Sequence, residues 1–247
     1  MRVVGEAGPG VLLIPGAGAR CAGFFPGLVE SLVAEPGCRV IEHDIPVGLA
    51  AASAHLHQII TASGIGPVVV VGQSLGGAIA LLLARDHPED VAGLVLLDVT
   101  PINDAALCRR AEWAFRVVGA VARIPLIGGV LTARAVAASL REARTMRPDC
   151  AAAQQRIAAE ADLAGLAHAV TGLGAVASGF DVAQLPRVPA AVVTADRPSG
   201  GATWRAHREL SDAFGVSLLS WPGSTHSVHL THPDETLASV RDVLSRV

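Results

Sequence analysis

Residues Val68 to Leu81 read VVVVGQSLGGAIAL, and this stretch decides the fold. The run of four valines is typical of a buried strand, and the apolar, alanine-containing run that follows favours a helix. Between them, Gly72-Gln73-Ser74-Leu75-Gly76 matches the pattern G-x-S-x-G. The stretch therefore predicts a strand, a sharp turn and a helix, with Ser74 at the tip of the turn.

The glycines of this motif have a steric reason. Side chains at positions 72 and 76 would collide with neighbouring chain, and the backbone at Ser74 would be strained. Such a turn lifts the Ser74 hydroxyl clear of the sheet. It also points the backbone N–H of Leu75 into the same space, at the positive end of the following helix. The pattern therefore indicates a nucleophilic serine and one candidate oxyanion donor.

The composition excludes several classes of protein. The chain has 247 residues, 51% of them hydrophobic, and a formal net charge of −3. Polar residues interrupt the most apolar windows, so we expect no membrane span, and the first ten residues lack the apolar core of a secretory signal. A cytoplasmic location is the default expectation. With no basic block and few aromatic residues, nucleic acid is not an expected partner.

Apolar segments alternate with helix-forming segments along most of the chain. Strands are expected at residues 10–16, 39–44, 68–72, 93–98, 190–195 and 216–221, and helices at 47–63, 75–86 and 233–247. This alternation, with fully apolar strands, indicates a parallel sheet that is covered on both faces. The fold class is therefore α/β.

Residues 101–184 interrupt the alternation. This stretch is rich in Ala and Arg, is helical in tendency and has no evident strand. Its length of roughly eighty residues is that of an independent subdomain. We therefore expect an α/β core of residues 1–100 and 185–247, with residues 101–184 inserted as a helical cap.

This arrangement resembles the α/β-hydrolase fold, and the resemblance covers essentially the whole chain. GQSLG takes the place of the family's nucleophile elbow, and the helical stretch follows the next strand, where the family's cap lies. Only nine residues precede the first expected strand, so the leading antiparallel hairpin is expected to be truncated or lost. The resemblance implies a mostly parallel sheet of about six main strands flanked by helices.

A serine nucleophile needs a base, and the family carries its histidine in a loop after the last strand. Residues 222–233 read PGSTHSVHLTHP, and His226 fits that position. His229 and His232 follow three and six residues later, and we interpret them as packing residues at the start of the last helix. The resemblance therefore implies that His226 is the general base.

Two aspartates compete for the role of the triad acid. Asp98 ends the segment GLVLLD, 24 residues after Ser74, which suits relatives whose acid precedes the cap. Asp196 lies in TADRPSGG, about two residues earlier than the turn that other relatives use. We favour Asp98 and keep Asp196 as the alternative. Either would hold the tautomer of the imidazole and stabilise the imidazolium that forms.

The resemblance also implies an oxyanion hole of two backbone N–H groups, from Leu75 and Ala17. Ala17 lies in Pro15-Gly16-Ala17-Gly18, where the family often has His-Gly-x, so the histidine of that pattern is missing here. The glycine-rich turn lacks G-x-G-x-x-G and G-K-[ST], which argues against a nucleotide site.

These parts predict a serine hydrolase that cleaves a carboxylic ester, lactone or thioester through an acyl-enzyme, with no metal or organic cofactor. One alternative keeps the fold and Ser74 but performs C–C hydrolysis or a lyase or cyclase step. A second alternative is a non-catalytic ligand-binding protein on the same fold. The expected partner is an apolar small-molecule substrate, with no nucleic acid, no membrane and a possible homodimer.

The residues that select the substrate should lie in the helical insertion. Its apolar side chains would either line an apolar pocket or pack the insertion onto the core, and together they favour an apolar acyl or ester group over a sugar or a charged peptide. They are Trp113, Phe115, Val117, Val118, Leu126, Ile127 and Leu131.

Overall fold

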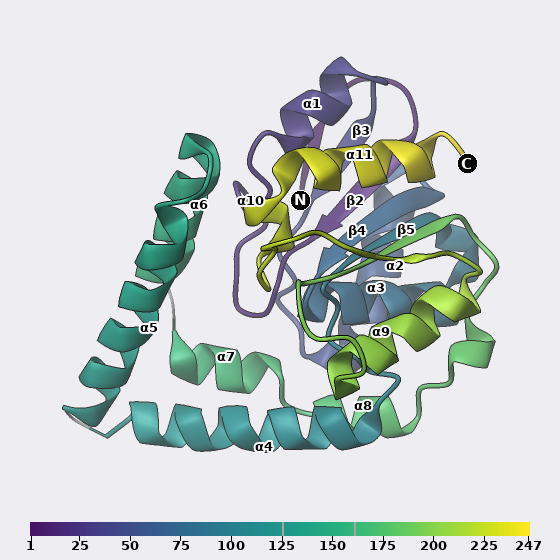
Figure 1. Ribbon diagram of the computed structural model, residues 1–247. Coiled ribbons are helices and arrows are strands. Elements are labelled where there is room, and N and C mark those ends of the chain that lie inside the picture. The colour runs from purple at the N-terminus through teal and green to yellow at the C-terminus, as the bar shows by residue number, and fades with distance from the viewer. Residues whose placement is uncertain (125, 161) are drawn as a thin grey trace.

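The computed structural model describes residues 1–124, 126–160 and 162–247, and in these ranges seven strands form one sheet (Figure 1). The strand order is β1-β3-β2-β4-β5-β6-β7, and every neighbouring pair is parallel except β1 and β3. The strands are β1 (Arg2–Val4), β2 (Gly10–Ile14), β3 (Arg39–Glu42), β4 (Val68–Gln73), β5 (Val91–Leu97), β6 (Ala190–Thr194) and β7 (Leu218–Ser220). The predicted α/β class with a mostly parallel sheet is confirmed.

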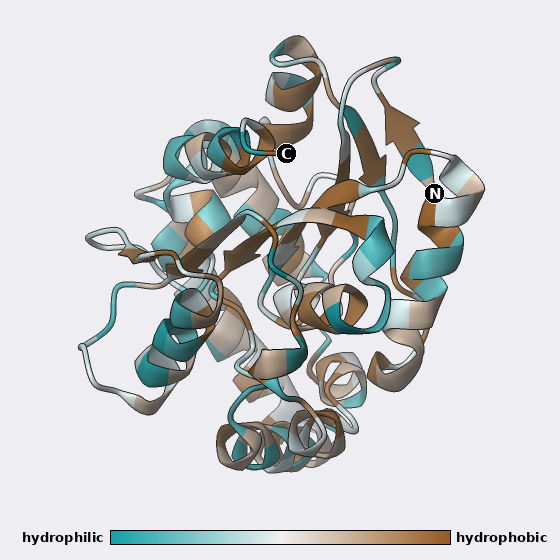
Figure 2. Cartoon of the chain, turned by 90° about the vertical axis from the view of Figure 1, so that its right-hand side faces the viewer, coloured by the Kyte–Doolittle hydropathy of each residue, from teal (hydrophilic) through white to brown (hydrophobic). Residues whose placement is uncertain are grey.

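Strand β4 lies in the middle of the sheet and is buried along its whole length. Because successive side chains of a strand point to opposite faces, its valines divide between two cores. Val68 and Val70 pack into the core on one face, and Val69 and Val71 into the core on the other. This is why the strand begins with a run of four valines, and the hydropathy colouring shows that the strands of the sheet are largely hydrophobic (Figure 2).

Helices cover both faces of the sheet. Two of them, α1 (Leu28–Ala34) and α11 (Pro233–Leu244), pack on one face. The other face is covered by α2 (Ala52–Ser63), α3 (Leu75–Asp86) and α9 (Ala202–Ala213). The expected helix at 47–63 begins later than predicted, because a 3-10 turn at Leu49–Ala51 precedes α2.

The amino-terminal edge of the sheet carries a seventh strand in addition to the six expected from the sequence. Strand β1 has three residues and runs antiparallel to β3, which leaves one short strand where a hairpin was expected to be truncated or lost. Val3 in β1 is 40% exposed, so this strand has no apolar run by which the sequence could have revealed it.

Five helices occupy the described part of residues 101–184. They are α4 (Ala105–Ala122), α5 (Ile127–Ala143), α6 (Pro148–Ala159), α7 (Leu163–Ala169) and α8 (Leu173–Ser178), followed by a 3-10 turn at Val182–Gln184. Helix α4 packs against α7 and α8, α5 packs against α6, and α6 reaches the short helix α10 (Val228–Thr231) of the core (Figure 1). The division of the chain into a core and a separate cap stays a prediction.

Helix α4 begins where the sequence provides a cap. The side chain of Asp104 accepts hydrogen bonds from the backbone N–H groups of Ala106 and Leu107, both at 3.0 Å.

Within the described ranges, no single helix is both long enough and apolar enough to cross a membrane. Helices α4 and α5 meet these two criteria only when they are taken together, and the pair is bent by 120°.

The chain order places several loops at one edge of the sheet. Strand β2 lies between β3 and β4, so the connections after β2 and β3 lead in opposite directions along the sheet. In open α/β sheets, ligands bind at such a reversal, beside the carboxyl ends of the strands. The loops that follow β2, β4, β5, β6 and β7 all start at this edge, and they carry the residues of the candidate site, with His226 in the loop after β7.

Candidate active site

Ser74 lies on the tight turn between β4 and α3 that the sequence predicts. Its backbone has φ 53° and ψ −119°, a conformation that is strained for a residue with a side chain. A Cβ at Gly72 would lie 2.5 Å from the carbonyl oxygen of Gly76, and a Cβ at Gly76 would lie 2.3 Å from the carbonyl oxygen of Ile14. The motif therefore needs glycine at both positions, for the steric reason expected from the sequence.

Backbone hydrogen bonds hold this turn against the next strand. The N–H of Ser74 donates to the carbonyl of Leu97 at 3.0 Å, and the N–H of Thr100 donates to the carbonyl of Ser74 at 2.9 Å. The end of β4 and the end of β5 are thereby fixed to each other. As a result Asp98, the residue after β5, is held beside the serine turn.

His226 connects Ser74 to Asp98. Its Nε2 lies 3.0 Å from Oγ of Ser74, and its Nδ1 lies 2.6 Å from Oδ2 of Asp98. The imidazole is thus bonded on one side to a hydroxyl and on the other to a carboxylate. The structure brings these three predicted residues together, although they lie on three separate loops.

Gln73 holds the histidine loop in place, and sequence reasoning missed this role. Its side chain is buried, and its amide Nε2 donates to the backbone carbonyl of His226 at 2.9 Å. Gln73, at the variable position before the serine in G-x-S-x-G, therefore holds the backbone of His226, the candidate general base. The signal was present in the sequence, since a buried polar residue at the end of an apolar strand needs a partner.

Asp98 is a buried carboxylate with several partners. Its Oδ1 accepts the N–H of Ala195 at 2.9 Å, and one guanidinium nitrogen of Arg197 lies 2.5 Å from both carboxylate oxygens. Burial raises the pKa of Asp98, but the hydrogen bond and charge of His226, with the contacts from Ala195 and Arg197, lower it below its usual value. The carboxylate is therefore ionised at neutral pH.

Asp196, the alternative acid, lies elsewhere. Its Oδ2 accepts the N–H of Gly223 at 2.7 Å, and its own N–H donates to Oγ of Ser224 at 2.9 Å. These bonds tie the loop after β6 to the loop after β7. The structure brings Asp98, and not Asp196, to His226.

A buried histidine supports the strand ends below Asp98. Nδ1 of His207 lies 2.9 Å from Oγ1 of Thr194, and its Nε2 lies 2.7 Å from the carbonyl of Val99. Burial lowers the pKa of His207 below its usual value, which favours the neutral imidazole. His229 is also fully enclosed and stacks on Phe24 with ring centroids 4.5 Å apart. This position agrees with its interpretation as a packing residue.

Ser74 and His226 open into a cavity of about 500 Å³. Ala17 and Leu75, the predicted oxyanion donors, line the same cavity, and Gly16 beside them lies against the side chain of Gln73. The rest of the lining is mainly apolar and includes Phe24, Phe115, Ile157, Leu166, Val170 and Leu173. The serine therefore faces a pocket that suits an apolar group.

The pocket differs from the one expected from the sequence. Of the seven apolar residues proposed for it, only Phe115 contributes; Trp113, Val117, Val118, Leu126 and Ile127 are exposed, and Leu131 is not part of the lining. The reason is helical geometry. Successive residues of a helix are about 100° apart, so Trp113 is turned about 200° away from Phe115.

Sequence reasoning missed the apolar lining from the later helices. Ile157 comes from α6, Leu166 from α7 and Leu173 from α8, while Phe24 comes from the loop after β2. Single apolar residues on short helices carry no local signal of what they face. Their shared position depends on how α6, α7 and α8 fold back over the sheet.

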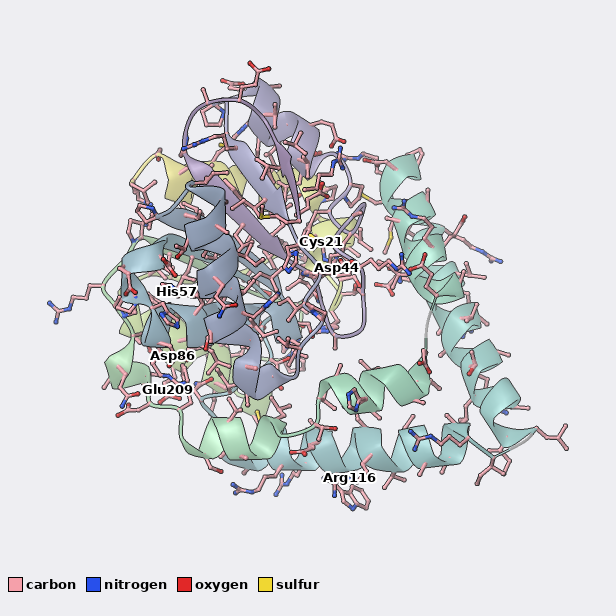
Figure 3. All side chains as sticks on the ribbon, turned by 180° about the vertical axis from the view of Figure 1, so that it is seen from behind. Cys21, Asp44, His57, Asp86, Arg116 and Glu209 are labelled. Atoms are coloured by element: carbon pink, nitrogen blue, oxygen red, sulfur yellow. The ribbon has the colours of Figure 1, made fainter. Side chains whose placement is uncertain are left out.

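Among the residues that the structure describes, one group of side chains has the composition of a metal site. His57, His87 and Glu89 lie close together beside the end of α3, with Nδ1 of His57 bonded to Asp90 at 2.7 Å (Figure 3 labels His57). None of them lines the cavity at Ser74.

Comparison with known proteins agrees with this architecture. The sequence profile of the Alpha/beta hydrolase family matches residues 11–240. The candidate carbamate hydrolase RutD of Variovorax paradoxus is 30% identical over 262 residues, covering 97% of this chain and 93% of that protein. Lipase LipV of Mycobacterium tuberculosis is 48% identical over 54 residues, which span 22% of this chain and only 21% of the lipase.

A solved structure shows the same fold at low identity. A thermophilic esterase from Thermogutta terrifontis superposes with a TM-score of 0.75 at 20% identity, over 98% of this chain and 93% of the esterase. The profile match over residues 11–240 and the 30% identity to RutD along almost the full chain show that this chain belongs to the alpha/beta hydrolase family. This confirms the resemblance inferred from the sequence, and with it membership of a family of hydrolytic enzymes.

Proposed function

We propose that this protein is a serine hydrolase that cleaves a carboxylic ester, lactone or thioester of an apolar small molecule. The observation that carries the proposal is the chain of hydrogen bonds from Ser74 through His226 to Asp98, which opens into an apolar cavity. A hydroxyl, an imidazole and a carboxylate in this order are the parts that activate a serine for attack on a carbonyl group.

In this mechanism His226 is the general base. Its Nε2 accepts the proton of Ser74 as Oγ attacks the substrate carbonyl, and Asp98 stabilises the imidazolium that forms. His226 then returns the proton to the leaving group, which leaves an acyl-enzyme on Ser74. Water, deprotonated by His226, attacks the acyl-enzyme and releases the acid.

Two backbone N–H groups stabilise the oxyanion in this proposal. They belong to Leu75, the first residue of α3, and to Ala17 in the loop after β2, both of which line the cavity at Ser74. The amino-terminal end of α3 adds a favourable partial positive charge. Donors of this kind, held in place before the reaction, are a large contribution to acyl-transfer catalysis.

The lining of the cavity favours an apolar acyl or alcohol group. Phe24, Phe115 and Leu173 are among the side chains that the bound substrate would meet. Arg197 also lines the cavity, but its positive charge is directed at Asp98. A neutral substrate therefore fits this cavity better than an acidic one.

Carbamate hydrolysis is a second candidate. It is favoured by the match along almost the full chain to RutD, which is named as a candidate carbamate hydrolase. The same residues would serve, because a carbamate also has a carbonyl carbon that Ser74 can attack. Rates for an ester and a carbamate with the same apolar group would separate the two candidates.

The first test is intact-mass analysis after treatment with a fluorophosphonate, a reagent that phosphonylates activated serines. We expect one adduct on the wild type and none on Ser74→Ala. Ser227→Ala is the matched control, because Ser227 lines the same cavity and its variant should retain the adduct. An unmodified, folded wild type would contradict the proposal and favour a ligand-binding role.

A further inference from the structure

The outer face of α4 and α5 is unusually apolar for a surface. We define this face by the exposed residues Trp113, Val117, Ile124, Leu126, Ile127 and Val130. Leu126 is 89% exposed and Trp113 65%. The structure describes few other exposed large apolar residues. Outside α4, α5 and their connection they are Met1, Val3, Val47 and Val247, within the described part of the chain. The apolar surface is therefore concentrated in one place, and such patches mark contact sites.

Positive charge accompanies this apolar face. Residues 105–143 contain six arginines and two glutamates, although the chain as a whole has a net charge of −3. Arg116 is 72% exposed, and its side chain lies at the outer edge of α4 (Figure 3). The outer face therefore combines apolar side chains with a local excess of cations.

Both glutamates are engaged toward the rest of the protein. Glu112 accepts the N–H groups of Gly172 and Gly174 at 2.9 Å and 2.8 Å, and these bonds lower the pKa of its carboxyl. Glu142 accepts a hydrogen bond from the hydroxyl of Thr225 in the histidine loop. Glu112 also pairs with the guanidinium of Arg116 at 3.3 Å, and the remaining five arginines of this stretch leave a local excess of positive charge.

We propose that the outer face of α4 and α5 binds an anionic lipid surface. In this arrangement Ile124, Leu126 and Ile127, at the connection between the helices, enter the headgroup region, and Arg116 and Arg123 meet lipid phosphates. Helices with an apolar face, arginines and an exposed tryptophan are typical of segments that lie in a lipid interface. From the sequence no membrane partner is expected, because polar residues interrupt its apolar windows, and the apolar side chains of the insertion are expected either to line a pocket or to pack against the core.

Charge decides between lipid and the other plausible occupant, a second copy of the chain. Two copies that meet through this face would bring their arginines together, which opposes association. An anionic surface neutralises the same charges. Charge complementarity therefore favours an anionic lipid surface over a homodimer.

The opposite side of α4 connects this surface to the cavity. Ala111 and Phe115 line the cavity at Ser74, while Trp113 and Val117 of the same helix face outward. A protein bound through this face would hold its cavity one helix away from the lipid. The inference thus deepens the proposed function, on which it rests: the apolar ester would be drawn from a lipid surface.

Co-sedimentation of the full chain with vesicles tests the proposal. We expect binding to vesicles of phosphatidylcholine mixed with an equal part of phosphatidylglycerol, and much weaker binding to phosphatidylcholine alone. Binding to the anionic vesicles should fall as salt is added, because salt screens exposed charges. The emission of Trp113 should shift to the blue on binding, and Trp113→Phe should remove that shift.

Two variants identify the surface that binds. Leu126→Ser combined with Ile127→Ser should weaken binding at least about tenfold, since two large apolar side chains no longer leave water. Arg123→Glu should weaken binding and reduce its salt dependence. Val247→Ser and Arg208→Glu are matched controls on exposed residues of the core, and both should bind like the wild type.

Three results would overturn the inference: no binding to anionic vesicles, equal binding to neutral vesicles, or unchanged binding of the Leu126/Ile127 double variant. A dimer in light scattering that this double variant dissociates would show that a second copy covers the face instead. Hydrolysis of a soluble short-chain ester separates this inference from the proposed function. The Leu126/Ile127 double variant should retain this soluble-ester activity even though it binds vesicles weakly. A wild type that forms no fluorophosphonate adduct would instead contradict the hydrolase proposal.

Discussion

At the scale of single residues, the candidate site is a set of side chains held by their neighbours. Asp98 has a positive φ of 43°, as Ser74 has of 53°, so two of the three proposed catalytic residues have strained backbones. Strain of this kind persists only where surrounding bonds impose it, and it is concentrated at functional sites. Backbone hydrogen bonds impose it here: Ser74 is bonded to Leu97 and Thr100, and the N–H of Asp98 donates to the carbonyl of Val193 at 2.8 Å.

The two candidate acids give the sharpest prediction at this scale. Asp98→Asn should lower kcat by about 10⁴, because an amide neither stabilises the imidazolium nor holds the required tautomer. Asp196→Asn should stay within about twofold of the wild type, because it only joins two loops. The measurement is kcat for a soluble ester, with circular dichroism of each variant. Full activity of Asp98→Asn would exclude it as the acid.

At the scale of elements, the serine turn depends on how closely β4, α3 and the end of β2 approach. A Cβ at Gly76 would lie 2.3 Å and 2.4 Å from the carbonyl oxygens of Ile14 and Pro15. Both are backbone atoms, so no side-chain rotation can relieve the contact. The glycine therefore sets the distance between α3 and the loop that carries Ala17.

Gly76→Ala should consequently destabilise the protein by about 1–3 kcal/mol, the usual cost of overpacking, and displace one proposed oxyanion donor. Urea unfolding gives the free energy, and kcat for a soluble ester gives the functional effect. Gly129→Ala in α5 is the matched control, because a Cβ at Gly129 would meet nothing within 4 Å and alanine favours a helix. If Gly76→Ala unfolded at the same urea concentration as the wild type, the steric account would be wrong.

At the scale of the whole molecule, the buried His229 makes the free energy of unfolding depend on pH. Burial, with the charge of His226, lowers the pKa of His229 from 6.5 to about 3. Between these values the unfolded chain binds a proton that the folded chain does not. The contribution of His229 to stability is therefore full above pH 6.5 and is lost as the pH falls toward 3.

His229→Phe should remove this dependence while retaining the stacking on Phe24. From about pH 8 to pH 5, the free energy of unfolding of the variant should fall by about 2 kcal/mol less than that of the wild type. Urea unfolding at several pH values measures the difference. His168→Phe, at an exposed histidine, is the control and should keep the wild-type slope. Parallel slopes for His229→Phe and wild type would show that His229 is not buried as a neutral group.

The sequence by itself determined the parts of this protein that depend on local chemistry. A run of valines, glycines at positions 72 and 76 and a serine between them specify the strand, the turn and the helix, because sterics and side-chain periodicity act within a few residues. The alternation of such units then specified the mostly parallel sheet. His226 was found by its place in the chain order, which the resemblance supplied.

Only the tertiary structure decided which distant residues meet. It brought Asp98 and not Asp196 to His226, placed Arg197 on that carboxylate and directed Phe115 inward and Trp113 outward on one helix. These partners are separated by many residues, so no local pattern specifies them. They are set by strand order in the sheet and by the rotation of each helix about its axis, which depend on packing of the whole chain.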